Sequence, residues 1–94
     1  MEYNIDSRLE PGTIVGDTGR TVLVADLIRE RVPTDTYSWW VAICHAEGEL
    51  HPFVVWDVFA RPEGWYASSG SYFKTFDEAE VNYVSRGGYP EGVF

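Results

Sequence analysis

Residues 37–46 read YSWWVAICHA and residues 52–60 read PFVVWDVFA, and these two apolar stretches decide the fold. Both are rich in the aromatic and β-branched residues that are enriched in β-strands. The segment between them, residues 47–49, reads EGE and supplies the glycine of a tight connection. The pattern therefore predicts an antiparallel hairpin.

The two histidines that flank the connection suggest the register of this hairpin. If His45 lies opposite His51, then Trp40 lies opposite Trp56. Cross-strand neighbours of this kind have their Cβ atoms about 4.5–5.5 Å apart, so the histidines could share a metal ion with a nearby glutamate. Because only two firm ligands are visible and a structural zinc site takes four, we expect exposed loop histidines here.

The chain continues from the hairpin into a further strand and a helix. Residues 61–64 (RPEG) indicate a turn, and residues 65–73 (WYASSGSYF) indicate a strand in which Gly70 predicts a bulge or the close approach of another backbone. Thr75 and Glu78 have the spacing of a capping box, so a helix begins there. We expect one helical face to carry the apolar residues Phe76, Ala79 and Tyr83, and the glycines 87 and 88 to end the helix.

Upstream of the hairpin the pattern is less uniform. Residues 13–15 and 21–24 flank a Gly/Asp turn and predict a second hairpin. Residues 24–32 fit both a helical stripe and a strand; we expect a strand because β-branched residues dominate its first half. The fold class predicted for the single domain, residues 1–94, is α+β: an antiparallel sheet of about four to five strands with one C-terminal helix packed on one face. Residues 1–12 are expected to be loosely ordered and residues 88–94 to form a short tail.

Composition excludes several classes of protein. The chain has 94 residues, 45% of them hydrophobic, and 15 acidic against 7 basic residues give a net charge of −8. These values argue against a disordered chain and against a uniformly basic nucleic-acid binder. No stretch approaches the roughly 20 apolar residues of a membrane span, and the N-terminus lacks the basic and apolar regions of a signal peptide. A single cysteine, Cys44, fits a reducing compartment, so we expect a cytoplasmic protein.

Alternation along the strands assigns the side chains of the hairpin to two faces, both of them apolar. We expect the helix to cover the face that carries Trp40, Ala42, Cys44, Val54, Trp56 and Val58, because small residues of the next strand leave room for it. The other face must then be covered by the N-terminal hairpin, by a second subunit or by a different partner, unless the sheet curls into a half-barrel. The candidate interface residues on that second face are Tyr37, Trp39, Val41, Phe53, Val55, Asp57, Phe59, Tyr66 and Tyr72.

Catalytic motifs are not evident in the sequence. Cys44 and His45 are adjacent on a strand and point to opposite faces, so they do not form a nucleophile–base pair. Asp57 is a lone carboxylate on an apolar face, for which we expect an arginine partner from a neighbouring strand. No Walker loop, dinucleotide-binding glycine motif or pair of positioned carboxylates is present. An enzyme is therefore the less favoured interpretation, and no cofactor is expected.

The stretch from Trp56 to Arg86 resembles small uncharacterised proteins of actinobacteria and their phages. The motif comprises a strand, the Gly-Trp-Tyr return at 64–66, and the sequence YFKTFDEA at 72–79 leading into a short helix that ends Ser-Arg-Gly at 85–87. The resemblance implies an antiparallel sheet with a helix, and a context in which many small proteins bind and inhibit a host or defence protein. It carries no catalytic residues.

These observations favour a non-enzymatic protein-binding module that acts through an aromatic sheet face, in the form of a phage-encoded inhibitor of a host or defence protein. One alternative is a homodimer that holds a small ligand near Asp57, Tyr66 and Tyr72. A second is an acidic mimic of nucleic acid, although the negative charge is dispersed along the chain. We expect a protein partner, with neither direct nucleic-acid binding nor a membrane.

Overall fold

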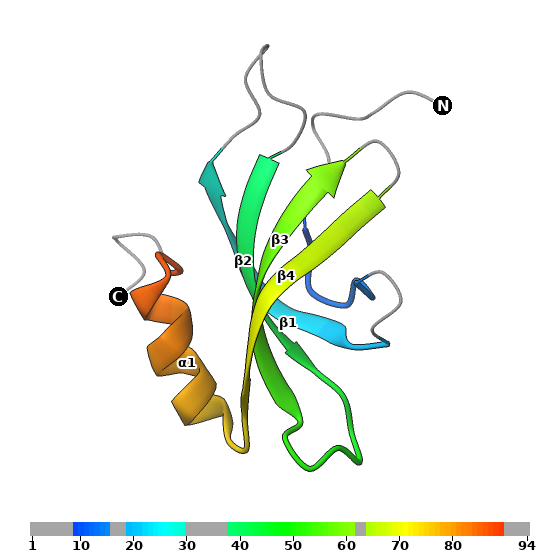
Figure 1. Ribbon diagram of the computed structural model, residues 1–94, viewed down its shortest axis with the longest axis vertical. Helices are drawn as coiled ribbons and strands as arrows, with labels where there is room; N and C mark the ends of the chain where they lie inside the picture. Colours follow the sequence, from blue (N-terminus) through cyan, green and yellow to red (C-terminus); the bar gives the residue numbers. More distant parts are fainter. Residues whose placement is uncertain (1–8, 16–18, 30–37, 62–63, 90–94) are drawn as a thin grey trace.

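The computed structural model describes residues 9–15, 19–29, 38–61 and 64–89. They form a four-stranded antiparallel sheet in sequence order followed by a helix (Figure 1). The elements are β1 (Thr21–Arg29), β2 (Ser38–His45), β3 (Phe53–Arg61), β4 (Gly64–Phe73) and α1 (Phe76–Ser85). The predicted α+β class is confirmed, as is the strand interpretation of residues 24–29; residues 30–32 lie outside the described ranges. No helix in these ranges has the length and apolar character needed to cross a lipid bilayer.

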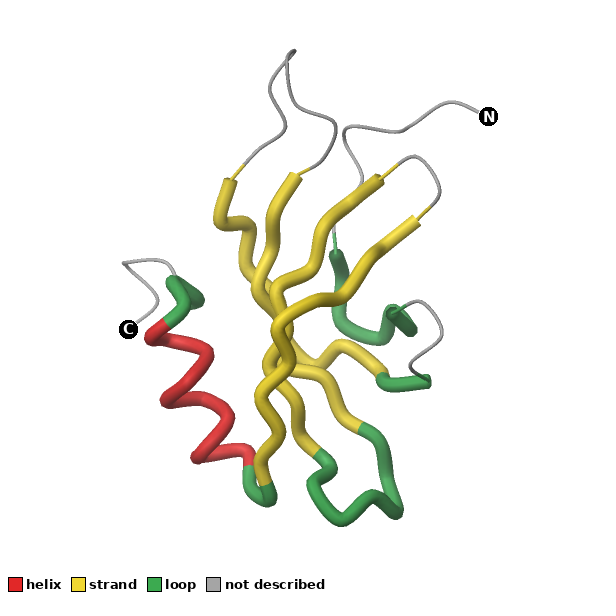
Figure 2. The backbone as a smooth tube through the Cα atoms, in the orientation of Figure 1, coloured by secondary structure: helices red, strands yellow, loops and turns green. Residues whose placement is uncertain are grey.

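The two faces of the sheet have different covers, which lie on opposite sides of it in Figure 2. Helix α1 packs on the face of Val41, Ile43 and Val55, all fully buried. The N-terminal segment 9–15 covers the other face, where its residues Leu9 and Val15 join a cluster made by Val22, Trp40, Ala42, Cys44, Val54, Trp56 and Val58. We expected the N-terminal hairpin as one possible cover of the face that α1 now occupies. Instead, residues 9–15, which include the first strand of that hairpin, cover the face of Trp40 and Trp56.

The prediction that α1 covers the face of Trp40 and Trp56 is wrong, and side-chain volume explains why. These two indoles fill the space above the small residues Ala42 and Cys44, and the segment 9–15 closes over them. The small residues therefore make room for neighbouring tryptophans, whereas α1 packs on the branched aliphatic side chains of the other face.

The register of the central hairpin differs from the expected one by two residues. His45 lies opposite Phe53, and Trp40 lies opposite Val58. The connection is longer than expected: residues 46–52 lie between the two strands, and the Ala46 N–H donates to the Pro52 carbonyl (3.0 Å) at the base of this loop. A shift of two residues leaves each side chain on its predicted face, since the period of a strand is two.

The bulge predicted at Gly70 is confirmed. Strand pairing passes from Asp57 opposite Ser68 to Val55 opposite Ser71, so that Ser69 and Gly70 together face Trp56. Ser69 has a φ of +57°, and a Cβ on Gly70 would lie 2.4 Å from the Trp56 Nε1 atom. The close approach is therefore made by an indole ring rather than by another backbone. The extra residue reverses the alternation after the bulge, so that Ser71 and Tyr72 lie on the opposite faces from those expected.

Helix α1 begins and ends as its sequence predicts. The Thr75 hydroxyl accepts from the Glu78 N–H (3.2 Å), and the Glu78 carboxylate accepts from the Thr75 N–H (3.3 Å), which confirms the capping box. After the helix, Gly87 adopts a φ of +104°, a conformation that favours glycine. The predicted apolar face is also correct, because Ala79 and Tyr83 are fully buried.

A carboxylate of β1 holds α1 and the turn after it. The Asp26 Oδ2 atom accepts from the Tyr83 hydroxyl (2.5 Å) and from the Tyr89 N–H (2.5 Å). Burial raises the pKa of Tyr83 strongly, and the hydrogen bond to Asp26 raises it further. Burial and a hydrogen bond to Glu80 raise the pKa of Tyr89 to about 12. Both phenols therefore stay protonated in the folded state at a pH where an exposed tyrosine ionises.

The bulge yields a pair of adjacent substitutions with opposite expected effects. Gly70→Ala is expected to lower the free energy of unfolding by about 1–3 kcal/mol, because its methyl group overlaps the Trp56 indole. Ser69→Gly is expected to be neutral or stabilising by a few tenths of a kcal/mol, because glycine adopts a positive φ without strain. Urea unfolding followed by tryptophan fluorescence measures both. Equal destabilisation by the two variants would contradict the bulge.

The Asp26 contacts predict a loss of stability in alkali. Because the folded state keeps the Tyr83 proton and the unfolded chain loses it near pH 10, the free energy of unfolding should be level around neutrality and fall above about pH 10. Tyr83→Phe is expected to cost about 1–2 kcal/mol at neutral pH through the lost hydrogen bond, and to decline less steeply in alkali. Urea titrations across this pH range provide the test; an identical alkaline slope in the variant would refute the explanation.

Candidate functional site

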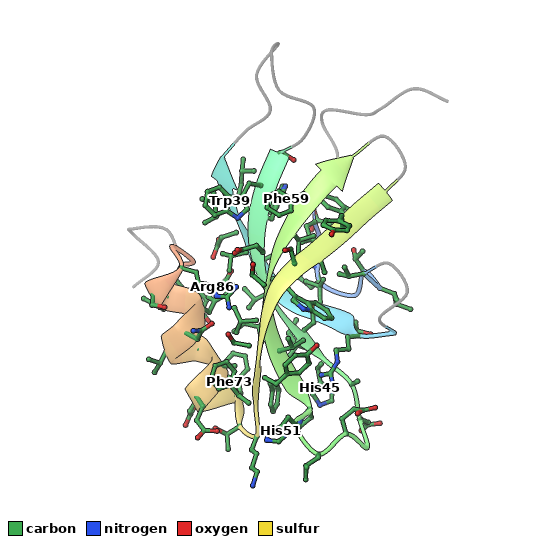
Figure 3. All side chains as sticks on the ribbon, viewed as in Figure 1. Trp39, His45, His51, Phe59, Phe73 and Arg86 are labelled. Carbon is green, nitrogen blue, oxygen red and sulfur yellow. The ribbon has the colours of Figure 1, made fainter. Side chains whose placement is uncertain are left out.

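Helix α1 covers only part of its face of the sheet, and an aromatic group lies beyond its C-terminal end. This aromatic patch consists of Trp39 on β2, Phe59 on β3 and Tyr66 on β4. The Trp39 and Phe59 rings stack with their centroids 6.3 Å apart and their planes at 26°, and Figure 3 shows them side by side past Arg86. Phe59 is the cross-strand partner of Tyr66. Tyr66 is 51% exposed, whereas Trp39 and Phe59 are partly exposed.

An ion pair marks the border between the aromatic patch and α1. Arg86 at the end of the helix lies 3.4 Å from the Asp57 carboxylate and donates to the Ser71 hydroxyl (2.9 Å) and to the Asn82 side chain (2.9 Å). The two charged side chains are 18% and 22% exposed. Asp57 does have the arginine partner that we expected, but this arginine comes from the helix rather than from a neighbouring strand.

The indole of Trp39 leaves one polar group unused. Its Nε1 atom is buried and has no hydrogen-bond acceptor in the part of the chain that the structure describes. Buried donors are normally paired, and an unpaired one costs about 1–3 kcal/mol. Among the described residues, the patch therefore combines an apolar surface with a buried donor that has no acceptor.

The structure separates the other candidate interface residues from this patch. Val41 and Val55 are fully buried below α1 and belong to the core. Phe53 packs edge-to-face on Phe76 of the helix, with centroids 6.0 Å apart. Tyr37 lies outside the described residues. Helix α1 therefore buries the part of the face that carries Val41, Phe53 and Val55, which we expected to contact a partner.

Tyr72 was assigned to this face and lies on the other one, because the bulge in β4 reverses the alternation. Its ring packs edge-to-face on Trp56, 6.5 Å away, and the Arg20 guanidinium lies 5.2 Å from its centroid. Arg20 is buried, donates to the Pro52 carbonyl (2.9 Å) and lies 4.0 Å from Glu49. Arg20 thus anchors the loop after β2. Sequence reasoning missed this role, for which the only signal was a lone arginine between a turn and a strand.

The two histidines are not brought together as a pair. His45 packs against the Phe53 ring, with centroids 5.0 Å apart, and Phe53 is also its cross-strand partner. Within the described ranges, no group of three or more His, Cys, Asp or Glu side chains is placed to hold a metal ion. His51 does not lie opposite His45 as expected, because the loop is longer and β3 begins only at Phe53.

Cys44 is fully buried, and burial raises the pKa of its thiol to about 12 against a smaller opposing effect of Arg20. A thiol of this kind is neither ionised nor reachable at neutral pH, so it does not serve as a nucleophile. It packs in the cluster under the N-terminal segment.

The native thiol is therefore expected to resist alkylation. At pH 8 a pKa of about 12 leaves roughly a thousandfold less thiolate than an ordinary cysteine has. Mass spectrometry after treatment with iodoacetamide should show labelling only once urea unfolds the chain. Rapid labelling of the folded protein would show that the cluster around Cys44 opens readily.

No family model, no curated protein and no solved structure matches this chain.

Proposed function

We propose that this protein is a non-enzymatic protein-binding module whose contact surface is the aromatic patch. The observation that carries the proposal is the stacked Trp39–Phe59 pair with the exposed Tyr66 beside it, outside the helix that buries the rest of the face. Tryptophan and tyrosine are enriched among the residues that contribute most to protein interfaces, because they bury a large area with little loss of side-chain freedom.

Charge favours a partner with a basic rim. The chain carries a net charge of −8, and the only ion pair at the border of the patch, among the described residues, is Asp57–Arg86. An acidic protein attracts a basic partner over distances of about a Debye length and orients it before contact. The apolar patch then supplies affinity, and the net negative charge of the chain supplies the rate of association and the choice of partner.

The chemistry near the patch supports binding rather than catalysis. The Asp57 carboxylate is paired with Arg86, and Cys44 is buried on the opposite face. In its more specific form, the proposal is that this binding inhibits a host or defence protein. A homodimer that buries two aromatic patches would bring two acidic chains together, which charge repulsion opposes.

The proposal predicts that capture of a partner depends on the patch. Tagged wild-type protein, Tyr66→Ala and Trp39→Ala are compared in a lysate of the organism that encodes the chain or of its host. Leu50→Ala is the matched control, because Leu50 is 78% exposed in the loop at the other end of the sheet. A protein identified by mass spectrometry is then purified and titrated against each variant. We expect affinity at least about tenfold weaker for the patch variants and unchanged for the control.

Thermal unfolding of each variant verifies that the fold is intact, and Tyr66→Ala, which removes an exposed ring, serves if Trp39→Ala is unstable. Equal affinity of wild type and Tyr66→Ala would refute the proposed surface. Light scattering supplies the other decisive outcome, since a dimer that dissociates in the Trp39→Ala variant would identify the patch as a homodimer interface.

A further inference from the structure

A second exposed apolar surface lies on the outer side of α1, away from the aromatic patch. It is a groove of about 300 Å³ lined by Glu80, Val81, Val84 and Tyr89, which we call the helix groove. Val81 is 73% exposed and Val84 is 50% exposed. Both residues contribute apolar area to the surface, and neither belongs to the buried clusters of the sheet.

Folding alone does not account for these two valines. Valine is a weak helix former because its branched side chain loses χ1 freedom against the preceding turn, and an exposed valine gains nothing from burial. The period of 3.6 residues puts Val81 and Val84 on one flank of α1 together with Asp77 and Glu80. Arg86 lies on the opposite flank, where it binds Asp57 and Ser71.

The far wall of the groove is held in place before anything binds. The Tyr89 hydroxyl donates to the Glu80 carboxylate (2.8 Å), its ring packs on Tyr83 with centroids 5.0 Å apart, and its N–H donates to Asp26. Its backbone has a φ of +55°, which a residue other than glycine rarely adopts and which these contacts maintain. A preformed wall lowers the entropic cost of binding.

The charge of this flank selects the occupant. Asp77 and Glu80 are carboxylates, and none of the described residues that line the groove is a lysine or an arginine. A second copy of the chain would bring the same carboxylates against them. The chain's own residues 90–94 read PEGVF and add a further carboxylate without a cation. Charge complementarity therefore favours a cationic partner segment over both.

We propose that the helix groove binds a segment of a partner protein in which one large aliphatic side chain is flanked by lysine or arginine. The aliphatic side chain lies against Val81, Val84 and the Tyr89 ring, and the cations lie near Glu80 and Asp77. The volume of the groove is at the lower end of the range for binding pockets, which fits one side chain rather than a whole helix. The helix groove is separate from the aromatic patch and does not depend on its function.

Peptide titration of the full-length, ¹⁵N-labelled protein tests this proposal at physiological salt. The probe is an acetylated and amidated peptide, Lys-Lys-Leu-Lys-Lys. One control peptide has alanine in place of leucine, and the other has glutamate in place of every lysine. We expect saturable amide shifts at Val81, Val84 and Tyr89 with the probe, about tenfold weaker binding of the alanine peptide, and no shifts with the glutamate peptide.

Variants locate the site. Val81→Ser and Val84→Ser change exposed side chains and are expected to weaken probe binding about tenfold, whereas Leu50→Ser and Trp39→Ala leave it unchanged. Equal binding of the leucine and alanine peptides would show charge attraction alone and would overturn the proposal. Shifts that cluster away from α1, or unchanged binding by both valine variants, would do the same. Because Trp39→Ala tests the aromatic patch, failure of one surface is distinguishable from failure of the other.

Discussion

The contact between the Trp56 indole and Gly70 is the constraint on which the rest of the structure depends. The indole occupies the space that any side chain at position 70 would need, and the backbone bulges there to accommodate it. One extra residue in β4 then turns Phe73 toward Val55 and Tyr72 toward Trp56. Helix α1 begins just after β4 and packs on the face that carries Phe73. Tyr72 points to the other face, where its ring contacts Arg20.

Two apolar surfaces remain exposed because each face of the sheet is covered by only one short segment. The N-terminal segment and α1 each take one face of the sheet, but α1 is a ten-residue helix and ends before the sheet does. Trp39, Phe59 and Tyr66 are left at the uncovered end, and two valines are left on the outer flank of the helix. Both surfaces lie on an acidic molecule, so each is suited to a partner that combines apolar and basic groups.

Local patterns predicted the elements well because their causes are local. The capping box at Thr75 and the strand alternation depend on residues close together in the chain. The assignment of faces failed at Tyr72, because one bulge reverses the alternation, and at α1, because the indoles of Trp40 and Trp56 filled the space reserved for it. Of the candidate site, Trp39, Phe59 and Tyr66 were found by their spacing, whereas Val41 and Val55 proved to be core.

The sequence by itself determined the α+β class, the central hairpin, the limits of the helix and the presence of aromatic side chains on both faces. These follow from periodicity, capping and charge, which act within a few residues. Only the tertiary structure decided which face each cover takes, that Arg86 reaches Asp57 from the end of α1, and which aromatic rings stay exposed. Those outcomes depend on the side-chain volumes of residues far apart in the chain and on the distances between them. Close packing of the folded core decides both.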